Sequence, residues 1–377
     1  MSTTAAATGI SLFIDPFSRH FLEDRLFGSD AAVYGGDDIL GPWTYLRRSL
    51  EQRGVSVHTA DRLLQGEHLG EHNVYMSFGI QENCRKIARM PEVVSSALFV
   101  FEGPIVQPSL YRNLEWAKDY FKRVYSFSDE EALAPFLRGP VELRHFALPS
   151  PVETIDEEAW ARTDRGFLVM INGNRLPRVF VDELYTERLR ALAFFGERGE
   201  IDLYGIGWDV VPYRPYPPWV PATAQRIHRS LIAASHRVRP DPLLEAARRV
   251  YRGATDDKGE TLSRYRFAVC YENQILKGWI TEKIFDCFRA GTVPVYWGAT
   301  DIEDYVPADS FIDFRRFDGY PALREFLHSL SDDEVEAYRV AGREFLASEA
   351  FYPFTKQAFA RRCTELIAAD TGVAIDD

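Results

Sequence analysis

Residues 266–313, RFAVCYENQILKGWITEKIFDCFRAGTVPVYWGATDIEDYVPADSFID, decide the fold class. An apolar run over 266–271 predicts a strand, and apolar residues at helical spacing predict a helix over 281–290. A second apolar run over 293–297 predicts the next strand. The order strand, helix, strand is typical of a parallel sheet that is covered by helices.

The same alternation recurs along the chain. It predicts further strands at 10–14, 55–58, 73–78, 97–101, 166–171 and 201–204, and helices at 42–53, 110–121, 181–195, 323–330, 333–346 and 356–369. Two Rossmann-like α/β domains that face a cleft are therefore expected. A proline-rich and then acidic stretch at 148–158 predicts a linker, whereas five prolines at 212–221 exclude regular structure and 222–263 gives no clear pattern. The expected parts are a first Rossmann-like domain at 1–150, a second at 160–345, and a helical segment at 346–377 that packs back on the first domain.

The bulk composition is that of a folded protein with an acidic balance. The chain has 377 residues, of which 46% are hydrophobic and 27% charged, and its formal charge is 44 − 56 = −12. That charge argues against a nucleic-acid partner, but a local basic cluster can still hold a phosphate. The four cysteines form no C-x-x-C pair, so buried free thiols are expected.

The beginning of the chain carries no basic segment followed by a long apolar run. We therefore expect a cytoplasmic protein without a signal peptide or transmembrane segment. Peripheral attachment to a membrane, through a partner or a lipid-linked acceptor, stays open.

Polar side chains gather where the strand at 266–271 ends and the next helix begins. Glu272 and Asn273 follow the strand, and Thr281 suits the N-cap of the helix. Lys283 then lies in the first helical turn, where a cation is unfavourable unless an anion is bound there too. This predicts a diphosphate at Lys283, with Glu282 accepting hydrogen bonds from ribose hydroxyls. An ordinary solvated pair of Glu282 and Lys283 is the alternative.

This region resembles a known family. Tyr271-Glu272-Asn273, Gly278–Lys283 and Val293–Gly298 are similar to the F-E-N, G-Y-[IV]-T-E-K and V-P-[IV]-x-x-G motifs of glycosyltransferase family 10, the α-1,3/4-fucosyltransferases. The resemblance implies a GT-B type fold, and it implies that Glu272 and Asn273 bind the donor. Trp279 stands where the family has a donor-contacting Tyr, so it keeps a ring and an N–H donor but loses the hydroxyl acceptor.

Two upstream segments extend the resemblance. Residues 171–178, INGNRLPR, are similar to the family's S-N-x-N…R segment. The resemblance assigns Asn174 to the donor site and Arg178 to its diphosphate, with Arg175 and Arg188 as rivals for the second role.

The other segment, residues 97–104, ALFVFEGP, looks like the family's apolar strand that ends in E-S-P. The resemblance implies that Glu102 is the catalytic base, although a carboxylate here could instead cap the turn or pair with an Arg. The acceptor is expected near Asp15, Phe17 and Glu102, where strand ends of the first domain face the cleft.

The resemblance implies an inverting fucosyltransferase. It would move L-fucose from GDP-β-L-fucose to a hydroxyl of an oligosaccharide or glycolipid, with an α-1,3 linkage to GlcNAc or glucose. No cofactor is implied. No D-x-D triplet occurs in the sequence, so we expect the reaction to be independent of a metal ion or only weakly stimulated by one.

Three other functions are weighed against this one. An inverting transferase could use another nucleotide sugar on the same scaffold, and a non-catalytic binder would need Glu282 and Lys283 but no base at Glu102. A dinucleotide enzyme is disfavoured because no G-x-G-x-x-G follows any predicted strand.

Overall fold

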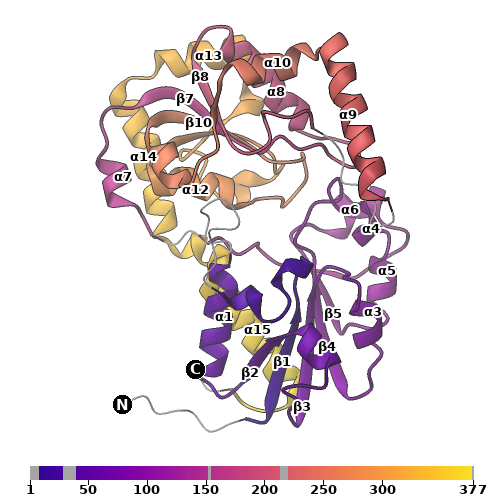
Figure 1. Cartoon of the computed structure of the whole chain (residues 1–377). Helices are drawn as coiled ribbons and strands as arrows, with labels where there is room; N and C mark the ends of the chain where they lie inside the picture. The colour runs from indigo at the N-terminus through magenta and orange to yellow at the C-terminus, as the bar shows by residue number, and fades with distance from the viewer. Residues whose placement is uncertain (1–7, 29–39, 152–153, 213–219, 376–377) are drawn as a thin grey trace. The chain divides into compact units, whose positions relative to one another are not determined.

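A computed structural model describes residues 8–28, 40–151, 154–212 and 220–375. The chain divides into two compact units (Figure 1). Unit 1 contains residues 1–153, 276–282 and 348–377, and unit 2 contains residues 154–275 and 283–347. Residues 152–153 of the expected linker and 213–219 of the proline-rich segment lie outside the described residues.

Unit 1 is built on a parallel sheet of six strands in the order β2-β1-β3-β4-β5-β6. The strands are β1 (Ile10–Asp15), β2 (Ser56–Thr59), β3 (His72–Phe78), β4 (Val93–Phe99), β5 (Arg123–Ser126) and β6 (Leu143–His145). The sequence predicts the first four. It does not predict β5 and β6, which have four and three residues with few apolar side chains.

Helices cover both faces of this sheet (Figure 1). One face carries α1 (Gly41–Glu51) and α15 (Lys356–Thr371), and the other carries α2 (Ala60–Leu64), α3 (Cys84–Ile87), α4 (Pro108–Tyr111) and α5 (Leu114–Ala117). The expected single helix at 110–121 is therefore wrong, because the chain breaks between α4 and α5. α15 is held against β5 by Asp370, whose carboxylate lies 3.0 Å from the guanidinium of Arg123.

Unit 2 has a second parallel sheet of six strands in the order β12-β11-β10-β7-β8-β9. The strands are β7 (Gly166–Ile171), β8 (Ile201–Tyr204), β9 (Tyr251–Gly253), β10 (Tyr265–Tyr271), β11 (Val293–Trp297) and β12 (Ile312–Asp313). On one face pack α8 (Tyr185–Gly196), α10 (Pro242–Arg249) and α13 (Gly319–Ser329). The remaining helices of this unit are α7 (Glu157–Ala161), α9 (Ala222–Val238), α11 (Lys258–Ser263), α12 (Glu282–Ala290) and α14 (Asp332–Leu346).

Two stretches differ from the sequence-based expectation. α7 begins inside the expected linker, where the side chain of Asp156 accepts a hydrogen bond from the backbone N–H of Ala159 and caps the helix. The stretch at 222–263 contains α9, α10, β9 and α11, although its composition predicts no element. None of the described helices is both long and apolar enough to cross a membrane.

Strand order locates the place in each unit where a ligand is expected to bind. β1 lies between β2 and β3, and β7 lies between β8 and β10. The strand order therefore reverses at β1 in unit 1 and at β7 in unit 2. Ligands of such sheets bind at this switch point, beyond the carboxyl ends of the strands. The switch point of unit 1 follows Asp15, and that of unit 2 lies between Asn172 and Glu272.

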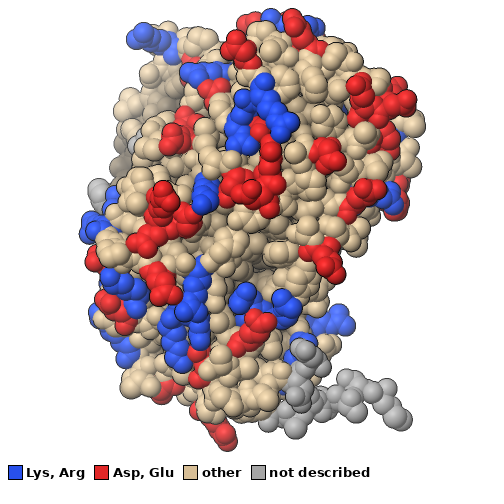
Figure 2. Space-filling model, turned by 180° about the vertical axis from the view of Figure 1, so that it is seen from behind, with Lys and Arg blue, Asp and Glu red and all other residues tan. Residues whose placement is uncertain are grey.

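The described cysteines and surface charges agree with the composition. Cys84, Cys270, Cys287 and Cys363 are all buried free thiols, which confirms the prediction. Figure 2 shows basic and acidic side chains intermixed over the visible face.

Candidate functional site

A buried ion pair lies at the switch point of unit 2. Glu272 is fully buried at the end of β10, and its Oε2 lies 3.0 Å from Nζ of Lys283 at the start of α12. The backbone N–H of Glu272 donates to the carbonyl of Trp297 at 2.8 Å, which fixes the residue beside β11. A lysine in the first turn of a helix opposes the helix dipole. The carboxylate of Glu272 offsets this cost, so it holds the ammonium group at a defined place.

The turn after β11 closes over this carboxylate. A Cβ atom on Gly298 would lie 2.4 Å from Cγ of Glu272 and 2.7 Å from the hydroxyl oxygen of Tyr296. No larger residue fits here without displacing Glu272. The Tyr296 hydroxyl accepts a hydrogen bond from the backbone N–H of Ala299 at 3.0 Å, which holds the turn against β11. Burial, with the charge of Glu272 as the second cause, raises the pKa of Tyr296.

Arg188 holds the end of β10 from the opposite side. It lies on α8, is only 4% exposed, and donates to the carbonyl of Tyr271 at 2.6 Å and to Oδ1 of Asn273 at 3.1 Å. Burial lowers the pKa of its guanidinium. The structure thus places this rival for the phosphate role beneath Asn273, where it orients the amide.

The loops after β7 and β8 are bound to each other. The indole N–H of Trp208 donates to the carbonyl of Asn172 at 2.6 Å, and Nδ2 of Asn174 donates to the carbonyl of Gly207 at 2.9 Å. Gly205 has φ +132°, and a Cβ there would lie 2.1 Å from the carbonyl oxygen of Asn172. The glycine therefore permits the close approach of the two loops.

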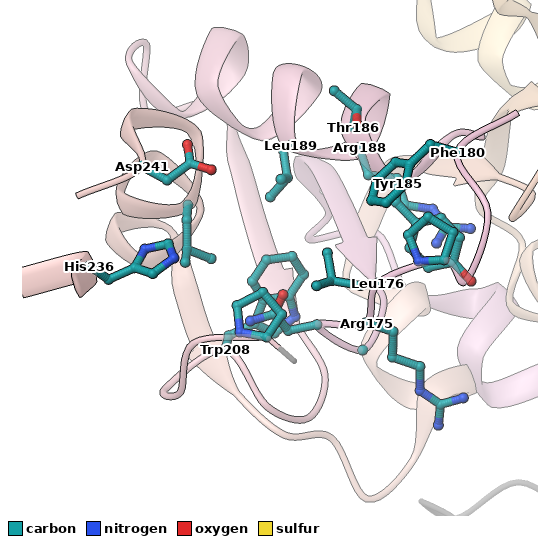
Figure 3. A pocket seen from close by; sticks show the side chains of 15 residues that line it. Arg175, Leu176, Phe180, Tyr185, Thr186, Arg188, Leu189, Trp208, His236 and Asp241 are labelled. Atoms are coloured by element: carbon teal, nitrogen blue, oxygen red, sulfur yellow. The ribbon is translucent and has the colours of Figure 1, made fainter. Parts of the chain in front are cut away.

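These loops, with α8, α9 and α10, enclose a cavity of about 180 Å³ (Figure 3). Its lining includes Asn174, Arg175, Leu176, Phe180, Tyr185, Arg188, Trp208, His236 and Asp241. Figure 3 shows His236 and Asp241 on one side of the cavity and Phe180 and Tyr185 on the other. Arg178 is exposed on the bend that follows and is not part of the lining. The aromatic lining residues are not predicted by the sequence pattern, although the run Gly205-Ile206-Gly207-Trp208 after β8 is a signal for Trp208.

Half of the motif that contains Lys283 belongs to the other unit. Residues 276–282 are part of unit 1, where Trp279 is 3% exposed and its ring centroid lies 4.4 Å from that of Phe127. Gly278 has φ +71°, and a Cβ there would lie 2.0 Å from the carbonyl oxygen of Phe127. Glu282, half-buried, is the last residue of this segment. The expected donor domain at 160–345 does not anticipate this division.

In unit 1, Asp15 lies at the switch point and is nearly buried. It is 5% exposed at the end of β1, and its Oδ2 accepts a hydrogen bond from the Tyr75 hydroxyl at 2.9 Å. Burial raises the pKa of Asp15 to about 6; the bond from Tyr75 opposes this shift, and the charge of Asp61 adds to it.

The loops that carry Phe17 and Glu102 meet at the ring of Trp43. The ring centroids of Phe17 and Phe101 lie 6.2 Å and 5.7 Å from that of Trp43. Glu102, which follows Phe101, is half-buried, and its Oε1 accepts a hydrogen bond from the next backbone N–H, that of Gly103, at 3.0 Å. This bond matches the turn-capping alternative, and it leaves the carboxylate near the same edge as Phe17.

The comparisons with known proteins agree with this arrangement. Residues 245–364 match the family model described as glycosyltransferase family 10 (fucosyltransferase) C-term. This stretch contains the ion pair of Glu272 and Lys283 and the closing turn at Gly298. This part of the chain is therefore similar to the C-terminal region of glycosyltransferase family 10.

Individual relatives match over a short part of the chain. It is 36% identical over 74 residues to an alpha-(1,4)-fucosyltransferase of Arabidopsis thaliana, which is 20% of this chain and 18% of that protein. It is 37% identical over 76 residues to the alpha-(1,3)-fucosyltransferase FucT of Helicobacter pylori, which is 19% of this chain and 16% of that protein. The aligned stretch thus spans less than a fifth of the length of these relatives.

A solved structure shows the fold of the whole chain. An alpha-glucosyltransferase in complex with UDP and DNA matches with a TM-score of 0.51 at 13% identity, over 95% of this chain and 99% of that one. With the two parallel six-stranded sheets, this likeness confirms two Rossmann-like domains of the GT-B type.

The raised pKa of Asp15 predicts a pH-dependent stability of unit 1. The folded-state pKa of Asp15, about 6, is above the ordinary aspartate value of 3.8. The contribution of Asp15 to stability is therefore fully present below pH 4 and is lost as the pH rises to about 6. We expect Asp15→Asn to remove this loss, so its unfolding free energy should gain up to about 3 kcal/mol on the wild type between pH 4 and pH 7. Urea unfolding of both proteins across that range measures the gain.

The matched control is Asp119→Asn, since Asp119 is an exposed carboxylate of the same unit. Its difference from the wild type should stay constant with pH. A constant difference for Asp15→Asn as well would contradict the prediction.

Proposed function

We propose that this glycosyltransferase moves L-fucose from GDP-β-L-fucose to a hydroxyl of a glycan, with inversion at the anomeric carbon. The observation that carries the proposal is Lys283, held by a fully buried Glu272 at the switch point of unit 2. A fixed ammonium group beside a helix N-terminus suits a diphosphate. The leaving GDP gains negative charge in the transition state, and such a site stabilises that charge.

The cavity beside this site suits the nucleoside. Its volume of about 180 Å³ is below the roughly 300–1,000 Å³ of pockets that take a whole ligand, so it would hold one part of the donor, such as the base. Tyr185 and Trp208 offer aromatic surface, and Asn174 offers amide groups. Arg188 joins the cavity to Asn273 at the strand end. In the proposal Arg178, which lies outside the lining, and Glu282 contact the diphosphate and ribose beyond the cavity.

Burial gives Glu272 and Trp279 supporting roles in the proposal. Glu272 acts on the donor through Lys283, which it orients, because its own carboxylate is fully buried. Trp279 is buried among the side chains of unit 1, so we propose that it positions the segment that leads to Glu282 and Lys283.

Unit 1 would bind the acceptor at the edge formed by Asp15, Phe17 and Glu102. We assign the general base to Glu102, because its half-buried carboxylate can reach a hydroxyl outside the protein. An α-1,3 linkage to GlcNAc or glucose, on an oligosaccharide or glycolipid, completes the proposal, as does a cytoplasmic location. An inverting transferase that uses another nucleotide sugar and a non-catalytic binder are the alternatives that the experiments below separate.

The first prediction concerns the donor. We expect the chain to bind GDP and GDP-fucose, and UDP much more weakly. Lys283→Met should weaken GDP binding roughly tenfold to a hundredfold, because a charged hydrogen bond contributes about 1.5–3 kcal/mol. Titration calorimetry measures both affinities.

Because Lys283→Met leaves Glu272 buried without this cation, the double variant Lys283→Met/Glu272→Gln should fold and still bind GDP weakly. Lys258→Met is the matched control, since Lys258 pairs with Asp286 of α12 at 3.7 Å, and it should bind GDP normally. Unchanged GDP affinity in the folded double variant rejects the role of Lys283, and preferred binding of UDP rejects the donor.

The second prediction concerns the base. Glu102→Gln keeps the shape and the bond to Gly103 but cannot take a proton. Turnover of GDP-fucose with a glycan acceptor should fall by about 10²–10⁴-fold, while GDP affinity stays normal. Glu142→Gln, at an exposed carboxylate of the same unit, should behave as the wild type.

Turnover of Glu102→Gln within a few-fold of the wild type would place the base elsewhere. If the wild-type chain binds GDP-fucose but transfers nothing to an array of glycans, the non-catalytic alternative holds instead.

The third prediction is metal independence, which we propose because Lys283 and the start of α12 supply positive charge at the diphosphate. Transfer measured by mass spectrometry should survive an excess of chelator. Loss of activity on chelation that manganese restores would overturn this part of the proposal.

A further inference from the structure

The helix α9 has a surface that nothing in the fold of unit 2 uses. None of its 17 residues is buried, although the sequence has an apolar residue at every turn. Ile227, Leu231 and Val238 are 61%, 63% and 87% exposed. Exposed apolar side chains at regular spacing on one element indicate an interaction surface.

The exposed apolar residues form one stripe. Successive residues of a helix turn by about 100°, so residues four, three and four apart lie on one face. Ile227, Leu231, Ala234 and Val238 have this spacing. The half-buried residues Gln225, Ile232, Ala233 and His236 lie on the opposite face, which is the one that the rest of the protein covers. The stripe therefore points away from the protein, and Figure 1 shows α9 at the margin of unit 2.

Arginines flank the stripe. Residues 222–239 contain four arginines and no acidic residue, in a chain whose net charge is −12. By the same rotation, Arg226 and Arg237 lie on one flank of the stripe, whereas Arg229 lies on the opposite face and Arg239 follows the end of the helix. An apolar stripe beside a basic flank, on a helix without acidic residues, is the pattern of a helix that lies in a membrane interface.

We propose that α9 docks this protein on an anionic lipid surface. The stripe defined by Ile227, Leu231, Ala234 and Val238 would enter the boundary between headgroups and acyl chains. The flanking arginines would extend their apolar stems over that boundary and place their guanidinium groups on lipid phosphates. Because the whole chain is acidic, attraction to an anionic surface must come from such a local basic element.

Two other binding partners for the stripe, a second copy of this chain and a nucleic acid, fit its charges and apolar residues less well. In a dimer through this stripe, the flanking arginines of two copies would lie close together and repel each other. A nucleic acid would bind the arginines through its phosphates but would leave the exposed Ile and Leu side chains without an apolar partner. A membrane surface satisfies both parts of the helix. The same helix contributes His236 to the cavity of unit 2 from its opposite face, so docking through the stripe leaves the cavity side of the helix in place.

Vesicle binding of the full chain tests the proposal. We expect the chain to co-sediment with vesicles of phosphatidylcholine and phosphatidylglycerol, to bind pure phosphatidylcholine far more weakly, and to be released by high ionic strength. Arg226→Gln/Arg237→Gln should lower the partition coefficient by roughly thirtyfold, and Ile227→Gln/Leu231→Gln by at least about tenfold. The matched control Arg361→Gln/Arg362→Gln, at two exposed arginines of α15, should bind as the wild type.

Because α9 has no buried residue, these variants should keep the melting temperature of the wild type, which shows that they fold. Failure of the wild type to bind anionic vesicles overturns the proposal. So does equal binding by the α9 variants, or a dimer in solution that Leu231→Gln converts to a monomer while vesicles bind neither form. The assay measures no turnover, so its outcome is independent of the proposed transfer reaction.

Discussion

The functional part of unit 2 is organised around the buried carboxylate of Glu272. A charge that is removed from water costs several kcal/mol unless a partner of opposite charge offsets it. Lys283 is that partner, at 3.0 Å, and the requirement explains a lysine in the first turn of α12, where the helix dipole alone would disfavour it. The same carboxylate requires glycine at 298, because its side chain occupies the space of a Cβ. One buried charge therefore accounts for the residue type at two further positions of the family motif.

A motif that is continuous in sequence is divided in the structure. Gly278 and Trp279 pack against Phe127 in unit 1, whereas Lys283, a few residues later, begins its helix in unit 2. The glycine is needed for a backbone contact and the tryptophan fills an apolar cluster. The first half of the motif thus has a structural explanation that involves no ligand. Only the second half, with Lys283, has the chemistry of an anion site.

The sequence predicts the fold well where strands are buried on both faces. All eight predicted strands exist, and the longer ones are rich in apolar residues, as expected of parallel strands under helices. β5, β6, β9 and β12 have two to four residues with few apolar side chains, and they were not predicted. α9 was missed because none of its residues is buried. Its apolar residues are few and stand between arginines and other polar residues, so they form no clear helical pattern. Within the site, the sequence pointed to Glu272 and Lys283, but spacing cannot tell a carboxylate that faces a ligand from one that faces its own lysine. A sequence pattern could not predict the burial of Arg188 either, because that burial depends on how α8 packs over β10.

The two carboxylates of unit 1 are separated by their environments. Asp15 has a pKa near 6, which suits proton transfer at neutral pH, but it is 5% exposed and already accepts a bond from Tyr75. Glu102 is half-buried; its Oε1 accepts a hydrogen bond from the N–H of Gly103, and its backbone carbonyl accepts one from the hydroxyl of Tyr111 at 2.7 Å. A base must first reach the proton that it removes, and only then does its pKa matter. In the proposed mechanism, greater exposure of its carboxylate favours Glu102 over Asp15 as the base. The buried Asp15 is better placed to orient the strand ends and the acceptor beside it.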